Sequence, residues 1–104
     1  MRRGEIWWAE LEPPAGRRPV VLLSRDEAYS VRSLIIVAPV TTRVRNIAAE
    51  VPLSSENGMS QDCAVNLDVI TTIPKDCLRS RIAILSPKKM REVEEAVRFA
   101  MALE

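Results

Sequence analysis

Apolar residues occur along the chain in short blocks that are separated by polar turns, several of them containing proline or glycine. Residues 5–11 have the aromatic, alternating character of a β-strand. The blocks 20–24 and 34–40 are short and almost wholly apolar, which is typical of core strands. Pro52 cannot donate to a ladder, so a strand around it should lie at a sheet edge. The remaining strands are expected at 50–53, 63–67, 69–73 and 82–85.

Two segments have the signals of a helix. Ser24 or Asp26 can cap a single helical turn that runs through Tyr29. Near the end of the chain, Ser86 supplies an N-cap and Pro87 a proline at the first helical position. Apolar residues then repeat at helical spacing and predict one amphipathic helix that closes the chain, with its apolar face made by Met90, Val93, Val97 and Ala100 and with Leu103 close to that face.

The order of these elements predicts the fold class. Five to seven short strands precede one terminal helix, without the strand–helix–strand alternation that a parallel sheet requires. A break near Asp68, which separates two of the strands, is expected to be a bulge. The sequence therefore predicts an α+β fold, a small and mostly antiparallel β-barrel with a C-terminal α-helix, formed as one domain over residues 1–104.

The near-neutral net charge of the chain conceals one strongly basic segment. The formal net charge of the chain is only +1, but residues 17–45 carry six arginines against Asp26 and Glu27, which makes that segment +4. The guanidinium group suits bidentate contact with phosphate. A solvated, salt-bridged surface is the alternative, and a nucleic acid is the partner that this composition favours.

The residue types that are missing restrict the possible chemistry. The chain contains no histidine, the commonest general acid or base. Cys63 and Cys77 therefore have no histidine to complete a zinc site, and we expect two reduced cysteines, no metal and no cofactor. The apolar stretch 6–9 is far too short for a signal or a membrane span, so the expected location is the cytoplasm.

Two strand ends deliver polar groups that suit RNA cleavage. RNA brings its own nucleophile, the 2′-hydroxyl, so a protein can promote scission by orienting that group and neutralising the phosphorane. Arg18, fixed by Pro19 and the strand behind it, is the candidate for neutralising charge, and Thr41 is the candidate donor to a phosphate oxygen. A strand-end ion pair and an ordinary strand threonine are the alternatives. Arg43 and Arg45 alternate with Val44 and are expected to follow a phosphate backbone, or to form a solvated charged face.

Four segments follow one another in an order and at a spacing that can be compared with known families. They are RGEIWWAEL at 3–11, RRPVV at 17–21, VAPVT at 37–41 and the predicted helix at 86–103. Together they resemble the MazF/PemK toxins, the ribonuclease halves of bacterial toxin–antitoxin pairs. The resemblance implies a homodimer of SH3-like barrels that cuts single-stranded RNA without metal. Its products would be a 2′,3′-cyclic phosphate and a 5′-hydroxyl, and a cognate antitoxin would silence it.

Carried over by position, the resemblance assigns site residues. The catalytic arginine of the family falls on Arg18 and its threonine on Thr41. The expected RNA-binding residues are Arg17, Thr42, Arg43 and Arg45.

The chain departs from the family pattern in its first loop, where only Ala15 and Gly16 separate the Pro-Pro turn from the arginine pair. Many members have a longer, acidic loop there, so the general base stays open, with Glu12 and Asp26 as candidates. The choice among mRNA, tRNA and rRNA stays open as well. Two rival functions also remain, a gyrase poison like CcdB on the same fold and an RNA-binding module that does not cut.

Overall fold

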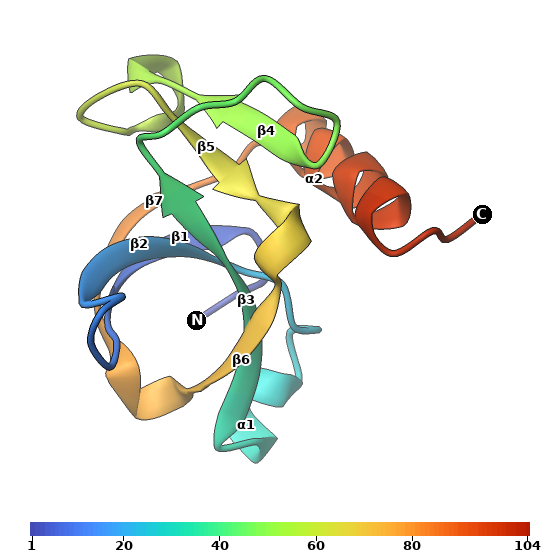
Figure 1. The fold of residues 1–104 in the computed structure, drawn as a ribbon. Helices are drawn as coiled ribbons and strands as arrows, with labels where there is room; N and C mark the ends of the chain where they lie inside the picture. The colour runs from blue at the N-terminus through green and yellow to red at the C-terminus, as the bar shows by residue number, and fades with distance from the viewer.

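A curled sheet of seven strands with one long helix against it makes up the fold in the computed structural model, which describes residues 1–104 (Figure 1). The path through the sheet is β4-β5-β3-β2-β1-β7, and β6 pairs with β3 off this path. Every strand pair is antiparallel. The expected α+β fold, a mostly antiparallel barrel-like sheet with a C-terminal helix, is therefore confirmed. The strands are β1 Glu5–Glu10, β2 Arg17–Leu22, β3 Leu34–Thr41, β4 Glu50–Leu53, β5 Cys63–Asn66, β6 Thr71–Pro74 and β7 Leu78–Ile84.

The strand β3 changes partners along its length, which curls the sheet. Its first half, from Leu34 to Val37, pairs with β6, whereas Val40 and Thr41 pair with β5. On its other side β3 pairs with β2 only from Val37 to Pro39. The end of β3 at Thr41 therefore belongs to the smaller sheet of β4 and β5, and the two parts of the sheet diverge there.

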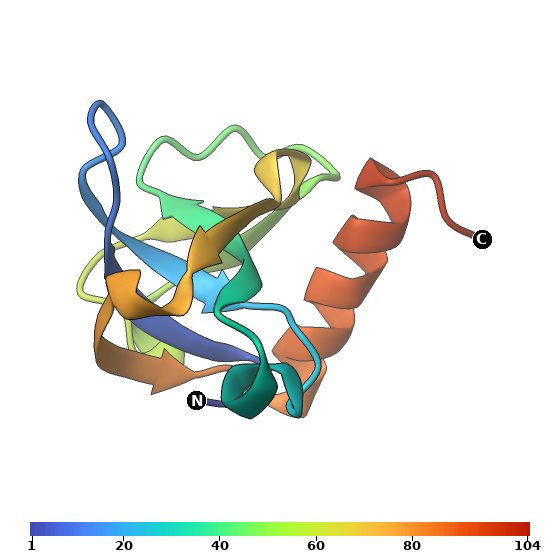
Figure 2. The same cartoon turned by 90° about the horizontal axis from the view of Figure 1, so that it is seen from below.

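Two hydrophobic clusters fill the two sides of this arrangement. The first lies between the sheet and the helix α2 (Pro87–Ala100) and includes Ile6, Val65 and Val93, all fully buried. The second lies inside the curl and includes Val20 and Ile35. Figure 2 shows α2 as a separate layer along one side of the sheet. None of the helices has the length and apolar character that crossing a membrane requires.

The terminal helix has the predicted start and the predicted buried face. The Ser86 hydroxyl accepts a hydrogen bond from the Lys89 N–H at 3.1 Å, which confirms the cap. Val93 is fully buried and Ala96, which the spacing argument did not include, is buried beside it. Met90, Val97 and Ala100 pack against the same cluster. Leu103, expected near this face, is 53% exposed, because the helix ends at Ala100 and the positive φ of Ala102 turns the chain away.

The short helix α1 (Ala28–Val31) lies close to its predicted position but lacks the predicted caps. Its N-cap is Glu27, and no side chain caps it. The Ser24 hydroxyl instead accepts a hydrogen bond from the Ile36 N–H at 2.8 Å, and the Asp26 carboxylate accepts one from the Arg3 N–H at 2.7 Å. Both side chains therefore connect this loop to distant segments, a use that a local capping pattern does not predict.

Two strand predictions also need correction, and one is confirmed. The last strand begins at Leu78, four residues before the predicted 82–85. The prediction missed this part because residues 79–81 are polar and exposed and carry no apolar signal. The break near Asp68 is a 3₁₀ turn, η2 (Leu67–Val69), in which the Asn66 side chain accepts from the Asp68 N–H at 3.0 Å; it is not a bulge. The strand that contains Pro52 lies at the sheet edge, as predicted.

Candidate active site

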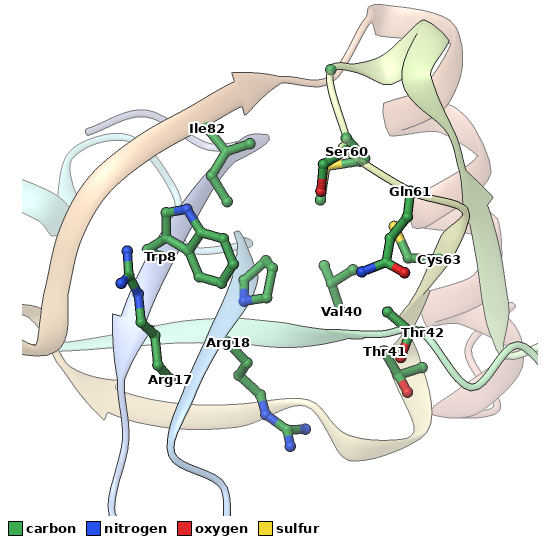
Figure 3. A pocket seen from close by; sticks show the side chains of 13 residues that line it. Trp8, Arg17, Arg18, Val40, Thr41, Thr42, Ser60, Gln61, Cys63 and Ile82 are labelled. Carbon is green, nitrogen blue, oxygen red and sulfur yellow. The ribbon is translucent and has the colours of Figure 1, made fainter.

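A cavity of about 440 Å³ opens between the start of β2, the end of β3 and the loop that leads into β5 (Figure 3). Its wall combines cationic, hydroxyl, amide and aromatic side chains with a few apolar ones. The residues that line it are Trp8, Arg17, Arg18, Pro19, Val40, Thr41, Thr42, Gly58, Met59, Ser60, Gln61, Cys63 and Ile82. The cavity therefore contains four of the six predicted site residues, namely Arg17, Arg18, Thr41 and Thr42.

The parting of β2 and β3 creates this cavity. The two strands pair as far as Val20 opposite Pro39, and the next residues have different neighbours. Arg18 lies opposite Ala9 of β1, and Thr41 lies opposite Ala64 of β5. Because an antiparallel register places Arg18 level with Thr41, the two residues stand on facing lips of the opening. The β2–β3 pairing thus brings together two residues that lie twenty-odd positions apart in the sequence.

The Arg18 side chain is anchored at one nitrogen and free at the others. Its Nε donates a hydrogen bond to the carbonyl oxygen of Ala15 at 3.3 Å. Neither terminal nitrogen has a hydrogen-bond partner in the chain, and no carboxylate forms a salt bridge with it. The alternative of a strand-end ion pair is therefore wrong. A half-buried guanidinium in this state can donate two parallel hydrogen bonds to one phosphate group.

Thr41 is half-buried at the opposite lip, and its hydroxyl oxygen accepts a hydrogen bond from the Arg43 N–H at 3.0 Å. This bond fixes the oxygen and leaves the hydroxyl hydrogen available to another acceptor. Thr42 is exposed beside it and also lines the cavity. Figure 3 shows both threonines on the same side of the opening, across from Arg18.

The two tryptophans lie on opposite faces of β1, because successive side chains of a strand alternate. Trp8 lines the cavity, and the guanidinium carbon of Arg17 lies 4.7 Å from the centroid of its ring. This cation–π contact holds a positive charge beside an aromatic surface. Trp7 instead packs against the cluster inside the curl, and its indole N–H donates to the Glu5 carboxylate at 2.9 Å.

Arg43 and Arg45 lie outside the cavity. Both side chains are exposed, on a segment after β3 that forms no strand. Their backbone N–H groups are bound by Thr41 and by Glu50, the latter at 2.8 Å. The chain leaves the sheet after Thr41, but Val44 between the two arginines is half-buried while both arginines are exposed, so the alternation along this segment is kept outside the sheet.

Neither predicted acidic residue reaches the cavity. Glu12 is exposed in the turn between β1 and β2, and Asp26 lines a different cavity together with Met1 and Tyr29. The lining of the cavity that Arg18 and Thr41 share contains no carboxylate. Cys63, which does line it, is buried, and this burial together with the nearby Asp62 charge raises the pKa of the thiol. The thiol is therefore protonated at neutral pH and is no ready nucleophile.

The lining residues Gly58, Met59, Ser60 and Gln61 were missed by sequence reasoning. They belong to the polar segment between β4 and β5, which the Asn57-Gly58 pair marks as a loop without showing where it packs. Gly58 has a φ of 89°, and a Cβ placed on it would lie 2.8 Å from the Cβ of Ala83. The loop therefore packs closely against β7, and the residues after Gly58 face the start of β2 and the end of β3.

Known proteins are similar to this chain in both sequence and fold. Residues 2–101 match the family described as the PemK-like, MazF-like toxin of type II toxin–antitoxin systems. A Mycobacterium tuberculosis protein named "Probable endoribonuclease MazF2" is 38% identical over 99 residues, which cover 94% of this chain and 95% of that protein. The solved structure of the Mycobacterium tuberculosis toxin MazF-mt6 is 34% identical, covers 96% of this chain and 98% of its own, and superimposes with a TM-score of 0.89.

A further solved structure, an endoribonuclease from Mycobacterial species in complex with its cognate antitoxin, has a TM-score of 0.88. It covers 100% of this chain and 97% of its own chain, but at 22% identity it shows the likeness of fold alone. The family match extends over nearly the whole chain, and the sequence relative covers almost its full length. The chain therefore belongs to the PemK/MazF family of toxins from type II toxin–antitoxin systems.

Proposed function

We propose that this endoribonuclease cuts single-stranded RNA without a metal ion, using the 2′-hydroxyl of the RNA as the nucleophile. The observation that carries the proposal is the position of Arg18 and Thr41 on facing lips of one cavity, each with donor groups that the chain itself leaves unused. A scissile phosphate between them would meet a guanidinium on one side and a hydroxyl on the other.

The reaction needs an attacking oxygen, charge stabilisation and a balance of one proton. The 2′-oxygen attacks phosphorus and releases its proton to solvent water, the bond from phosphorus to the 5′-oxygen breaks, and the leaving 5′-oxygen takes up a proton from water. The products are a 2′,3′-cyclic phosphate and a 5′-hydroxyl. Arg18 neutralises the negative charge of the phosphorane, and Thr41 donates to a non-bridging oxygen. One preorganised donor of this kind typically contributes about 3–4 kcal/mol to the transition state.

The composition of the lining determines which contributions this chain can make. Because the lining offers neither a carboxylate nor a histidine, electrostatic stabilisation by Arg18 and alignment of the RNA are its main contributions. Arg17 and Thr42 bind the RNA at the rim, and Arg43 and Arg45 bind its backbone beyond the cavity. The phosphate contacts position the strand and carry no sequence information.

The partners follow from the family and from the surface. We propose that a cognate antitoxin neutralises the chain by laying an acidic segment over the arginine-lined cavity, and that the chain acts in the cytoplasm. We also propose a homodimer, because large apolar side chains stay exposed on one copy, with Phe99 64% and Met101 58% exposed at the end of α2. The antitoxin complex known for a protein of this fold supports the first partner.

One specific observation favours a second function, an RNA-binding module that does not cut. This observation is the lack of a carboxylate in the cavity, which leaves no residue placed to take the 2′-hydroxyl proton. A comparison of an all-ribose RNA with one that carries a 2′-deoxy sugar at the scissile nucleotide separates the two functions, because the nuclease cuts only the all-ribose RNA and the binding module cuts neither.

The test is to incubate the EDTA-treated chain with a long transcript and to map both ends of every fragment. Cuts with a cyclic phosphate and a 5′-hydroxyl, absent at a 2′-deoxy position, are expected. Tight RNA binding without any cut would support the binding module, and cleavage that needs added metal would contradict the proposed chemistry.

A further inference from the structure

The loop that carries Ser60 and Gln61 is fixed at both ends of its turn. The short helix η1 (Ser55–Asn57) begins with a reciprocal cap, in which the Ser54 hydroxyl accepts from the Glu56 N–H and the Asn57 side chain accepts from the Ser54 N–H. Gly58 then turns in the left-handed region against β7. The next residue, Met59, is buried with only 8% of its surface exposed. The side chains that follow are therefore presented to the cavity from a preorganised backbone.

Gln61 is the only side-chain amide in the cavity lining, and it is exposed to solvent there. In Figure 3 its amide end lies between Val40 and the two threonines, on the far side of the cavity from Trp8. Arg17 lies on the outer side of Trp8 in the same view and supports the ring by the 4.7 Å contact. The cavity thus has an aromatic wall on one side and a group with both a donor and an acceptor on the other.

We propose that this cavity holds one base of the RNA next to the scissile phosphate, with Trp8 as a stacking surface and Gln61 as the residue that reads the base edge. The inference rests on the proposed function and extends it to sequence specificity. Single-stranded RNA is read in this way in general, by stacking on aromatic rings and by hydrogen bonds to exposed base edges. The cationic residues at the rim do not discriminate among bases, because they contact phosphate.

The amide chemistry of Gln61 gives the inference a direction. An amide offers one acceptor and one donor, which pair with an adjacent donor and acceptor on a base. The substitution Gln61→Glu replaces this pair with two acceptors. Guanine is the only RNA base whose Watson–Crick edge presents two adjacent donors, at N1 and N2. The carboxylate should therefore shift the preference at one position of the cleaved sequence towards guanine, whatever base the native amide selects.

The experiment compares cleavage patterns on one randomised transcript pool. The wild-type chain, Gln61→Glu and Gln61→Ala are each incubated with the pool, and the bases around every cut are counted. Glu56→Gln serves as the matched control, because Glu56 is exposed in the same segment and does not line the cavity. Circular dichroism and thermal unfolding establish that all four chains are equally folded.

The expected result is a change confined to one position of the cleaved sequence. Discrimination there falls about tenfold with Gln61→Ala, the loss typical of one bidentate base contact, and moves to guanine with Gln61→Glu. Glu56→Gln keeps the wild-type pattern. A wild-type chain that cuts, together with Gln61 variants that cut the same sequences at the same relative rates, would overturn this inference and leave the proposed function intact. A folded wild-type chain that cuts nothing would overturn both.

Discussion

Val20 and Pro39 form the last residue pair between β2 and β3 before the two strands diverge. Beyond this pair, β2 continues along β1 and β3 continues along β5. This last pair is two residues away from Arg18 on one strand and from Thr41 on the other, so both residues border the opening. The main chain therefore brings the two site residues together through a change of strand partners, and no loop has to close over the substrate to assemble them.

Replacement of Arg18 should remove cleavage while the fold persists. The only hydrogen bond of its side chain is a long one to the carbonyl oxygen of Ala15, and it forms no salt bridge, so Arg18→Ala should lose little stability. Loss of a charge-stabilising donor is expected to slow cleavage about 10²–10³-fold. Single-turnover cleavage of a short RNA measures the effect, and Arg25→Ala, exposed and outside the cavity, should cut like the wild type. If Arg18→Ala unfolded the chain, the residue would be structural instead.

Gly58→Ala should destabilise the chain much more than Gly16→Ala. Both glycines have positive φ, 89° for Gly58 and 62° for Gly16, so each substitution introduces backbone strain of about 1 kcal/mol. Only at Gly58 does the added Cβ meet an atom, the Cβ of Ala83 at 2.8 Å, whereas nothing lies within 4 Å at Gly16. Urea unfolding should therefore show the larger loss for Gly58→Ala, by about 1 kcal/mol or more. Equal losses would contradict the close contact between the loop and β7.

Acidification should weaken the fold through Glu5. Burial by itself raises the pKa of this carboxyl, but hydrogen bonds from the Trp7 indole, the Arg2 N–H and Arg81 more than offset it and hold the pKa below its ordinary value of 4.5. A depressed pKa means that the stabilisation is fully present above the ordinary value and is lost as pH falls through the lower, folded-state pKa.

Trp7→Phe removes the hydrogen bond that lowers the pKa of Glu5 most, so the free energy of unfolding should depend less on pH in acid. The free energy of unfolding, measured in urea at several pH values below neutrality, checks this. Trp8→Phe, which has no bond to Glu5, should keep the wild-type slope. A slope that both variants share with the wild type would show that Glu5 is not responsible.

The exposed arginines after β3 should contribute to affinity for RNA without contributing to specificity. Truncating Arg43 and Arg45 leaves their backbone hydrogen bonds to Thr41 and Glu50 in place, so the fold should be unaffected. Each lost phosphate contact reduces the salt slope of RNA binding by about 0.7 for a single strand. Binding measured from low to moderate salt should show this loss for every RNA sequence. An unchanged slope would place both side chains away from the RNA.

The sequence predicts the elements whose signals are local and periodic. The Ser86–Pro87 start of α2 and its buried Val93 follow from capping chemistry and helical spacing. Arg18 and Thr41 could be chosen because Arg18 stands at the start of one apolar strand and Thr41 at the end of another. Gln61 could not be chosen in this way, because its position depends on Met59 burial and on the contact of Gly58 with a strand about 25 residues further along the chain.

Tertiary contacts also explain the predictions that were wrong. Ser24 has the chemistry of a cap but is used to bind Ile36 in the neighbouring strand. Asp26 was a candidate for the general base, and its bond to the Arg3 N–H keeps it near the N-terminus instead. In each case the residue type indicated which interaction the side chain can form, but a segment distant in sequence supplied the partner.

A double-mutant cycle shows whether Arg18 and Thr41 act on the same phosphate. Single-turnover cleavage rates of one RNA are measured in EDTA for the wild type, Arg18→Ala, Thr41→Ala and the double variant. Residues that act as a unit on one transition state are strongly non-additive. The double variant is therefore predicted to cut little more slowly than Arg18→Ala alone. Rate losses that multiply fully would contradict a shared phosphate and assign the two residues to separate tasks.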